Sequence, residues 1–128
     1  YDLLDGGISD PIPITWFRSI GYKRNIVILT RPKGYRKKKN NLSVAIKLLM
    51  RKYPKIAKAM ERRYEVYNST IDELKRLEEE GDTFILRPSQ DLGIKRTETN
   101  PDKLQRVYNI GLKDANDNLE MIRKFLAM

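Results

Sequence analysis

The sequence predicts an α/β protein with two parallel strands and helices packed on them. Two short, strongly apolar segments lie near residues 26–30 and 83–87, and such runs are typical of strands buried on both faces. The chain between them, on the order of 50 residues, has helical periodicity, and a crossover of that length makes neighbouring strands parallel with a right-handed connection. With 128 residues, 40% of them hydrophobic, the chain has the size of one domain and can bury a core.

The N-terminal part is expected to be a loop followed by a short helix. Two adjacent glycines and two prolines make residues 5–13 loop-like, because glycine permits positive φ and proline has no amide donor. A helix over residues 14–20 should end at Gly21. The first strand then ends at Arg31-Pro32, and Arg87-Pro88 ends the second strand in the same way.

Three further helices are predicted, near residues 43–53, 55–80 and 101–126. Pro54 either breaks the first of them or opens the second at its first turn. In the second helix, apolar side chains recur every three or four residues and form one stripe, which consists of Ile56, Met60, Tyr64, Tyr67, Ile71, Leu74 and Leu77. Asn100 is a suitable cap for the last helix, because Pro101 then takes its first position.

The composition excludes several classes of chemistry. Lys and Arg number 26 against 17 Asp and Glu, so the formal net charge is +9. The sequence has no cysteine and no histidine, which excludes disulfides, zinc–thiolate sites and a Ser-His-Asp triad within this chain. No apolar run reaches the ~20 residues that span a bilayer, and no signal peptide or phosphate-binding motif is recognisable. We therefore expect a cytoplasmic protein that uses neither a metal nor another cofactor.

Asp5-Gly6-Gly7 is the first candidate for catalytic chemistry. An aspartate before two glycines lets the backbone turn tightly and leaves the carboxylate without bulky neighbours. In a chain without histidine, a carboxylate can itself accept the proton of a serine nucleophile, which gives a Ser-Asp dyad. The alternative is structural: the aspartate caps its own turn by accepting hydrogen bonds from backbone N–H groups.

The order of motifs in residues 1–32 is a second pointer to function. The chain has, in this order, Asp-Gly-Gly-Ile-Ser-Asp-Pro-Ile-Pro at residues 5–13, a short helix with Trp16, Gly21-Tyr22 and the apolar residues 25–32. This order of motifs resembles the patatin-like phospholipase family, specifically its bacterial branch. The resemblance implies an α/β acyl hydrolase. Such enzymes hydrolyse lipid esters with a serine in a Gly-x-Ser-x-Gly elbow and an aspartate in Asp-Gly-Gly, and they need no histidine.

Within this resemblance, Asp5 is the dyad aspartate, and Gly6 and Gly7 shape its turn. Residues 1–32 correspond to the end of the catalytic domain, and residues 33–128 to a helical C-terminal extension with one further strand. The chain has no Gly-x-Ser-x-Gly and lacks the family's glycine-rich oxyanion loop. We therefore expect the C-terminal portion of such an enzyme, which acts on a lipid or other acyl ester but is inactive without the serine supplied from outside this chain.

The two predicted strands are too few for an ordinary sheet, which has about 4–6 strands. Their edges need neighbours, because an unpaired edge leaves rows of N–H and C=O groups open. Either this chain is the later part of a larger α/β domain, which we favour, or another copy covers the edge. A fragment of this kind is expected to self-associate through the exposed strand edge.

Residues 31–63 carry 13 Lys and Arg residues against one acidic residue. One interpretation is a patch that docks peripherally on an anionic membrane surface, with candidate contacts from Arg31, Arg36, Lys37, Lys38 and Lys39. The alternatives are a basic module that binds nucleic acid or an acidic partner, and a solvated helix face. Nucleic acid is the weaker interpretation, because the tyrosines of this region fall on helix positions and not on a strand platform.

Overall fold

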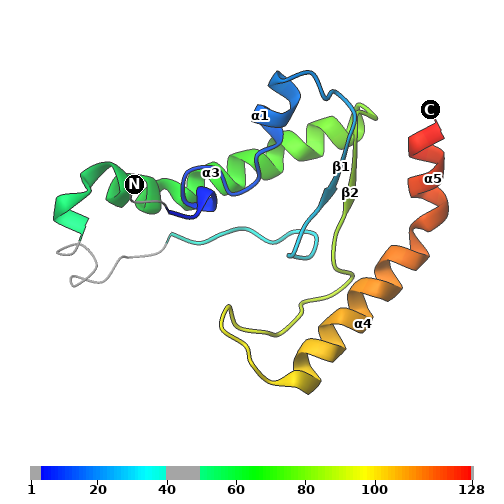
Figure 1. Cartoon of the computed structure of the whole chain (residues 1–128). Helices are drawn as coiled ribbons and strands as arrows, with labels where there is room; N and C mark the ends of the chain where they lie inside the picture. Colours follow the sequence, from blue (N-terminus) through cyan, green and yellow to red (C-terminus); the bar gives the residue numbers. More distant parts are fainter. Residues whose placement is uncertain (1–3, 40–49, 128) are drawn as a thin grey trace. The chain divides into compact units, whose positions relative to one another are not determined.

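A computed structural model describes residues 4–39 and 50–127 of the chain (Figure 1). In these residues the protein is a small mixed α/β structure with four helices and a parallel sheet of two strands, which confirms the predicted fold class. Most of the predicted helix 43–53 lies outside the described residues. Its described end forms a 3₁₀ turn, η2 (Met50–Lys52).

The chain divides into two compact units that alternate along the sequence. The first unit comprises Tyr1–Lys23 and Arg36–Glu79, and the second comprises Arg24–Tyr35 and Glu80–Met128. The first unit holds the Asp-Gly-Gly turn and the longest helix, whereas the second holds both strands and the two C-terminal helices.

The sheet of the second unit consists of β1 (Asn25–Ile28) and β2 (Thr83–Leu86), which run parallel as predicted. The register pairs Asn25 with Thr83 at one end and Ile28 with Leu86 at the other. Each strand is slightly shorter than its apolar run. Beyond the strand ends, the pairing continues with one hydrogen bond, from the Leu29 N–H to the Leu86 carbonyl at 2.9 Å.

The prediction that both strands are buried on both faces is wrong for β1. Asn25 and Leu29 are buried, but Ile26 is 38% exposed and Ile28 is 71% exposed. Side chains alternate between the faces of a strand, so one face of β1 is covered and the other is open. The reason is the small number of layers, because the described chain contributes just two strands and too little else to cover the second face. Self-association through this open strand stays a prediction.

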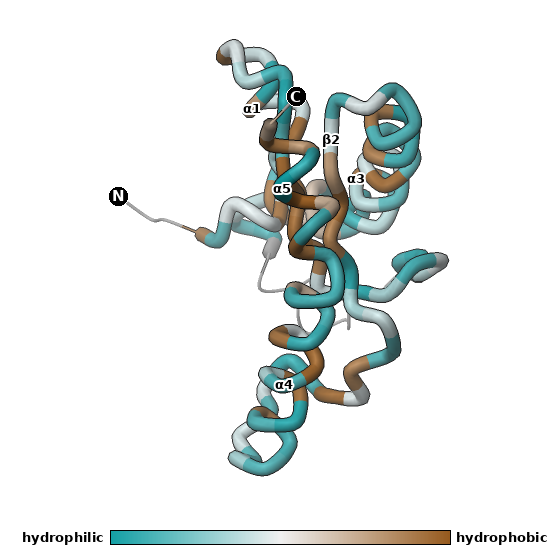
Figure 2. The backbone as a smooth tube through the Cα atoms, turned by 90° about the vertical axis from the view of Figure 1, so that its right-hand side faces the viewer, coloured by the Kyte–Doolittle hydropathy of each residue, from teal (hydrophilic) through white to brown (hydrophobic). Residues whose placement is uncertain are grey.

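The predicted helix 101–126 is interrupted, so the structure has two helices there: α4 (Pro101–Asp117) and α5 (Leu119–Ala127). Asn118 separates them with φ −100° and ψ 0°. Its side-chain Nδ2 donates to the Asp114 carbonyl at 2.8 Å, and its backbone N–H points to the same carbonyl. A short amide side chain thus competes with the helix for its own carbonyl groups, as asparagine does at helix ends. Hydrophobic and polar residues alternate along both helices (Figure 2), so the hydrophobic pattern alone does not indicate this break.

Two side chains fasten the C-terminal helices to the rest of the second unit. Asp114 is buried, at 6% exposure, and its Oδ2 accepts a hydrogen bond of 2.9 Å from the Ser89 N–H in the loop after β2. Phe125 of α5 packs against Phe84 of β2 with ring centroids 6.0 Å apart. The Arg24 guanidinium lies 4.7 Å above the Phe125 ring. The sheet and α5 therefore share an aromatic contact.

The first unit is organised on the long helix α3 (Pro54–Glu79). Pro54 opens this helix at its first position, which decides between the two roles predicted for it. The predicted apolar stripe is its covered face, and Leu74 and Leu77 are fully buried. A 3₁₀ turn, η1 (Gly6–Ile8), and the short helix α1 (Ile14–Ser19) complete the unit.

None of the helices in the described ranges is long and apolar enough to cross a membrane.

We predict that Asp114→Ala lowers the free energy of unfolding by about 1–2 kcal/mol, because the Ser89 N–H loses its acceptor in a partly buried position. Urea denaturation followed by circular dichroism measures this change. Asp117→Ala is the matched control: Asp117 is exposed on the same helix and pairs with Lys113, so its loss should cost less than about 0.5 kcal/mol. Equal costs for the two variants would contradict the role assigned to Asp114.

Candidate functional site

The Asp-Gly-Gly segment forms a single 3₁₀ turn that its own aspartate caps. Asp5 is the N-cap of η1, and its Oδ1 accepts a hydrogen bond of 2.8 Å from the Gly7 N–H. The Asp5 carbonyl accepts a second bond, of 3.1 Å, from the Ile8 N–H. The residue is exposed, so the carboxylate remains accessible while one of its oxygens is fixed. The two interpretations of Asp5 are compatible in this geometry, because the bond that caps the turn also orients a potential proton acceptor.

The two glycines contribute differently to this turn. Neither Gly6 nor Gly7 has a positive φ, so the expected left-handed conformation is absent in this turn. A Cβ atom added at Gly7 would lie 3.2 Å from Asp5 Oδ1, tighter than most carbon–oxygen contacts, whereas one added at Gly6 would meet no atom within 4 Å. A side chain at residue 7 would therefore crowd the carboxylate in its capping position, and no steric reason in the described structure requires Gly6.

Helix α3 passes next to this turn and presents an arginine to it. Arg63 Nη2 lies 3.6 Å from the point that a Cβ at Gly7 would occupy. Arg63 is half-buried, and its Nε is buried without a hydrogen-bond partner in the described part of the chain. From the sequence, Arg63 is predicted only as one cation of the basic segment. Its spacing of three residues from Met60 and four from Tyr67 was the available signal that it lies on the covered face.

Part of the basic segment is held against α3 by hydrogen bonds. The Asn68 side chain binds the backbone of Lys37 twice: its Oδ1 accepts from the Lys37 N–H at 2.9 Å, and its Nδ2 donates to the Lys37 carbonyl at 3.0 Å. Arg36 donates to the Asn68 carbonyl at 2.9 Å and forms an ion pair with Asp72. The Asn68 amide thus pairs with both backbone groups of one residue, as a neighbouring strand would. Sequence spacing does not reveal such a role, so Asn68 was not predicted.

The Arg36–Asp72 pair shifts the ionisation of both groups. The hydrogen bond between them, followed by their charges, raises the pKa of Arg36 and lowers the pKa of Asp72 below its ordinary value of 3.8. The Asp72 carboxylate therefore stabilises the folded chain above pH 3.8, and this contribution is lost as the pH falls through the lowered pKa. Both side chains are more than half exposed, so the contribution is small.

The remaining candidate contacts of the basic segment have different surroundings. Lys38 and Lys39 are exposed and belong to the first unit. Arg31 belongs to the second unit, where its guanidinium lies 4.9 Å from the ring centroid of Tyr35. Of the candidate membrane contacts in the first unit, Lys38 and Lys39 therefore have the most accessible charges, and they follow directly after Arg36 and Lys37, which are held against α3.

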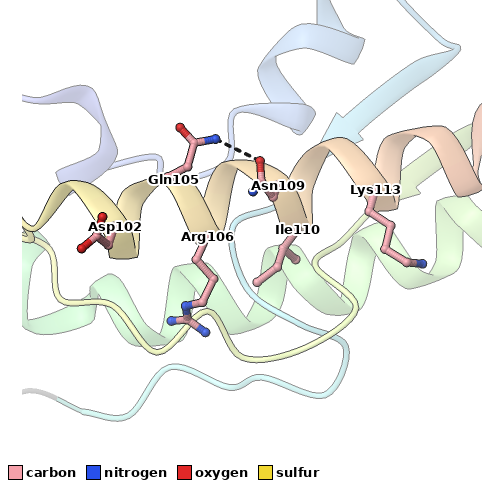
Figure 3. Close-up of a pocket in the computed structure, with 6 residues that line it drawn as sticks. All are labelled: Asp102, Gln105, Arg106, Asn109, Ile110 and Lys113. Atoms are coloured by element: carbon pink, nitrogen blue, oxygen red, sulfur yellow. Dashed lines mark hydrogen bonds between the residues drawn. The ribbon is translucent and has the colours of Figure 1, made fainter.

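An open hollow on α4 carries no comparable arrangement (Figure 3). The residues that line it all come from this one helix: Asp102, Gln105, Arg106, Asn109, Ile110 and Lys113. The Gln105 side chain donates to Asn109, and Arg106 Nη2 donates to the Leu92 carbonyl at 2.8 Å. These polar groups bind one another or the adjacent loop, so the hollow is a feature of the helix surface.

Among the described residues, no three potential metal-ligating side chains gather in one place.

Comparison with known proteins identifies one family. Residues 53–127, more than half of the chain, match the family described as a domain of unknown function, DUF6363. No curated protein and no solved structure matches the chain. The matched range begins just before α3 and runs through α5, so it includes Arg63 and Asn68 and leaves the Asp5 turn outside.

Proposed function

We propose that this chain, which belongs to the DUF6363 family, is the C-terminal portion of a serine acyl hydrolase of the patatin-like type, with Asp5 as the base of a Ser-Asp dyad. The observation that carries the proposal is the capped, exposed Asp5 carboxylate, one oxygen of which is fixed at 2.8 Å by the Gly7 N–H. A general base must be both accessible and held in position. The motif resemblance of residues 1–32 supplies the reaction class.

The proposed reaction needs one group from this chain and two from outside it. Asp5 removes the proton from a serine of the Gly-x-Ser-x-Gly elbow, and the serine oxygen attacks the acyl carbonyl. Backbone N–H groups of the upstream oxyanion loop stabilise the negative oxygen, and the alcohol leaves with the proton. Asp5 then takes a proton from water as the water oxygen attacks the acyl carbon; the bond to the serine oxygen breaks, the fatty acid leaves, and Asp5 returns the proton to the serine. The chain on its own is therefore inactive.

An acyl substrate also suits the exposed aromatic side chains of the first unit. Ile14 is the buried residue of α1, whereas Trp16 is 59% exposed. Phe17 is exposed as well and stacks on Tyr22 with ring centroids 4.6 Å apart. Covering such exposed aromatic side chains with acyl chains or a lipid interface is favourable, because it removes apolar surface from water.

We predict that Asp5→Asn lowers kcat for ester hydrolysis by roughly 10²–10⁴-fold in the protein that joins this chain to an in-frame Gly-x-Ser-x-Gly segment, because the amide cannot accept the serine proton. Hydrolysis of a short-chain p-nitrophenyl ester measures the change. Asp10→Asn, in the same loop, is the matched control and should keep activity within about twofold of the wild type. Full activity of Asp5→Asn would overturn the dyad assignment.

We further propose that the basic segment docks this enzyme on an anionic membrane surface, as a peripheral protein of the cytoplasm. The support is charge: residues 31–63 hold 13 of the 26 basic side chains, and Lys38 and Lys39 are exposed. Arg36 and Lys37 of the same unit are further members of this contact set, and Arg31, which belongs to the second unit, stays a separate prediction. A lipid surface brings the enzyme to its substrate, whereas nucleic acid has no role in the proposed reaction.

Charge removal at Lys38 and Lys39 tests this docking. We predict that the double variant Lys38→Gln/Lys39→Gln binds vesicles with 30% phosphatidylglycerol roughly thirtyfold more weakly than the wild type, since each lysine near such a surface contributes ~1 kcal/mol. The matched control is Lys95→Gln/Arg96→Gln, which removes two exposed cations of the second unit. Equal losses for the two double variants would contradict a defined patch. Stronger, salt-sensitive binding to RNA without lipid preference would favour the nucleic-acid interpretation.

A further inference from the structure

Arg63 occupies a position where a helix normally places an apolar side chain. On α3, the covered face carries Met60 three residues before it and Tyr67 four residues after it, so Arg63 lies in the middle of the apolar stripe. The preceding residue, Arg62, points away from this face and donates from Nε to Glu65 at 3.3 Å. Two adjacent arginines of one helix therefore have opposite environments.

The guanidinium of Arg63 is incompletely satisfied. Its Nε is buried and has no hydrogen-bond partner in the described part of the chain. Charged groups that leave water are normally paired, because an unpaired donor of a buried cation is among the most unfavourable groups in a protein interior. A position of this kind suits an anionic partner that is not part of the polypeptide.

The Arg63 guanidinium also lies next to the open space beside Gly7. The point that a Cβ at residue 7 would occupy is 3.6 Å from Arg63 Nη2 and 3.2 Å from Asp5 Oδ1. A small group held by Arg63 would therefore lie beside the carboxylate. Gly7 keeps this approach open, since a side chain there would fill the space between the two residues.

We propose that Arg63 binds the phosphate group of a phospholipid substrate and thereby positions its ester next to Asp5. Arginine is suited to this role, because its planar fork donates two parallel hydrogen bonds to phosphate oxygens. In a glycerophospholipid the phosphate and the nearest ester are joined by a short glycerol segment, so one molecule reaches both residues. This inference rests on the proposed hydrolase function. Arg63 forms no covalent bond with the substrate and is a positioning residue.

Binding to the 128-residue chain tests the anion site without any hydrolysis. The probes are monomeric dihexanoylphosphatidylcholine, dihexanoylglycerol, which has the same acyl chains without phosphate, and inorganic phosphate. NMR spectra of the ¹⁵N-labelled chain report the Gly7 amide and the Arg63 Nε resonances. We expect dihexanoylphosphatidylcholine to shift both resonances and dihexanoylglycerol to shift neither.

Arg62 provides the matched control for the variants. We expect Arg63→Gln to weaken the binding of dihexanoylphosphatidylcholine by roughly tenfold or more, because a charge-assisted hydrogen-bond pair is lost, and Arg62→Gln to change it by less than about twofold. Equal losses for the two variants, or equal binding of dihexanoylglycerol, would overturn the site. Binding of inorganic phosphate but not of the phospholipid would overturn the lipid assignment.

Thermal unfolding separates this role from a structural one. Arg63→Met replaces a half-buried cation with a buried, unpaired Nε by an apolar side chain, so the proposal predicts an unchanged or raised Tm together with the loss of phospholipid binding. A lowered Tm with intact binding would show that Arg63 is structural. The proposed hydrolase function is judged separately: if Asp5→Asn loses activity while Arg63→Gln binds and hydrolyses the phospholipid normally, only the anion site fails.

Discussion

The hydrogen bond from the Gly7 N–H to Asp5 Oδ1 is the interaction on which the proposed chemistry depends. It fixes one carboxylate oxygen within a three-residue turn and leaves the side chain exposed. An aspartate in a flexible loop would sample many orientations, and a proton acceptor gains its effect from being held where the proton is released. In the proposed dyad this carboxylate takes the part that histidine plays in a Ser-His-Asp triad, and the 128 residues contain no histidine.

Helix α3 supports this turn through a surface that serves two purposes. The C-terminal half of α3 has an ordinary apolar face, which includes the fully buried Leu74 and Leu77. Further toward its N-terminus the same face carries Arg63, whose partly desolvated charge lies near Gly7. On another side of α3, the Asn68 side chain binds the backbone of Lys37, and Asp72 pairs with the Arg36 guanidinium. Within the first unit, α3 thus contacts both the Asp5 turn and the part of the basic segment that contains Arg36 and Lys37.

The sequence predicted the elements whose signals are local. The apolar runs located β1 and β2, the three- and four-residue spacing located α3, and Asn100 capped α4 through its bond to the Lys103 N–H. It missed two features that depend on side-chain hydrogen bonds. Asn118 interrupts the last helix and donates from its side chain to the Asp114 carbonyl, four residues earlier, whereas the buried Asp114 carboxylate accepts from the Ser89 N–H, 25 residues away. For the site, Asp5 and its glycines could be proposed from motif order alone, whereas the environment of Arg63 emerged only once η1 was placed against α3.

The most direct test of the proposed dyad is the rate at which a fluorophosphonate labels the serine in a protein that joins this chain to an in-frame Gly-x-Ser-x-Gly segment, compared between Gly6→Ala and Gly7→Ala. A methyl group at residue 7 would crowd Asp5 Oδ1, whereas one at residue 6 meets no atom within 4 Å. If Asp5 activates the serine, Gly6→Ala should label at the wild-type rate and Gly7→Ala roughly tenfold or more slowly, in line with the loss of an oriented base. Wild-type labelling of Gly7→Ala would contradict the assignment of Asp5 as the base.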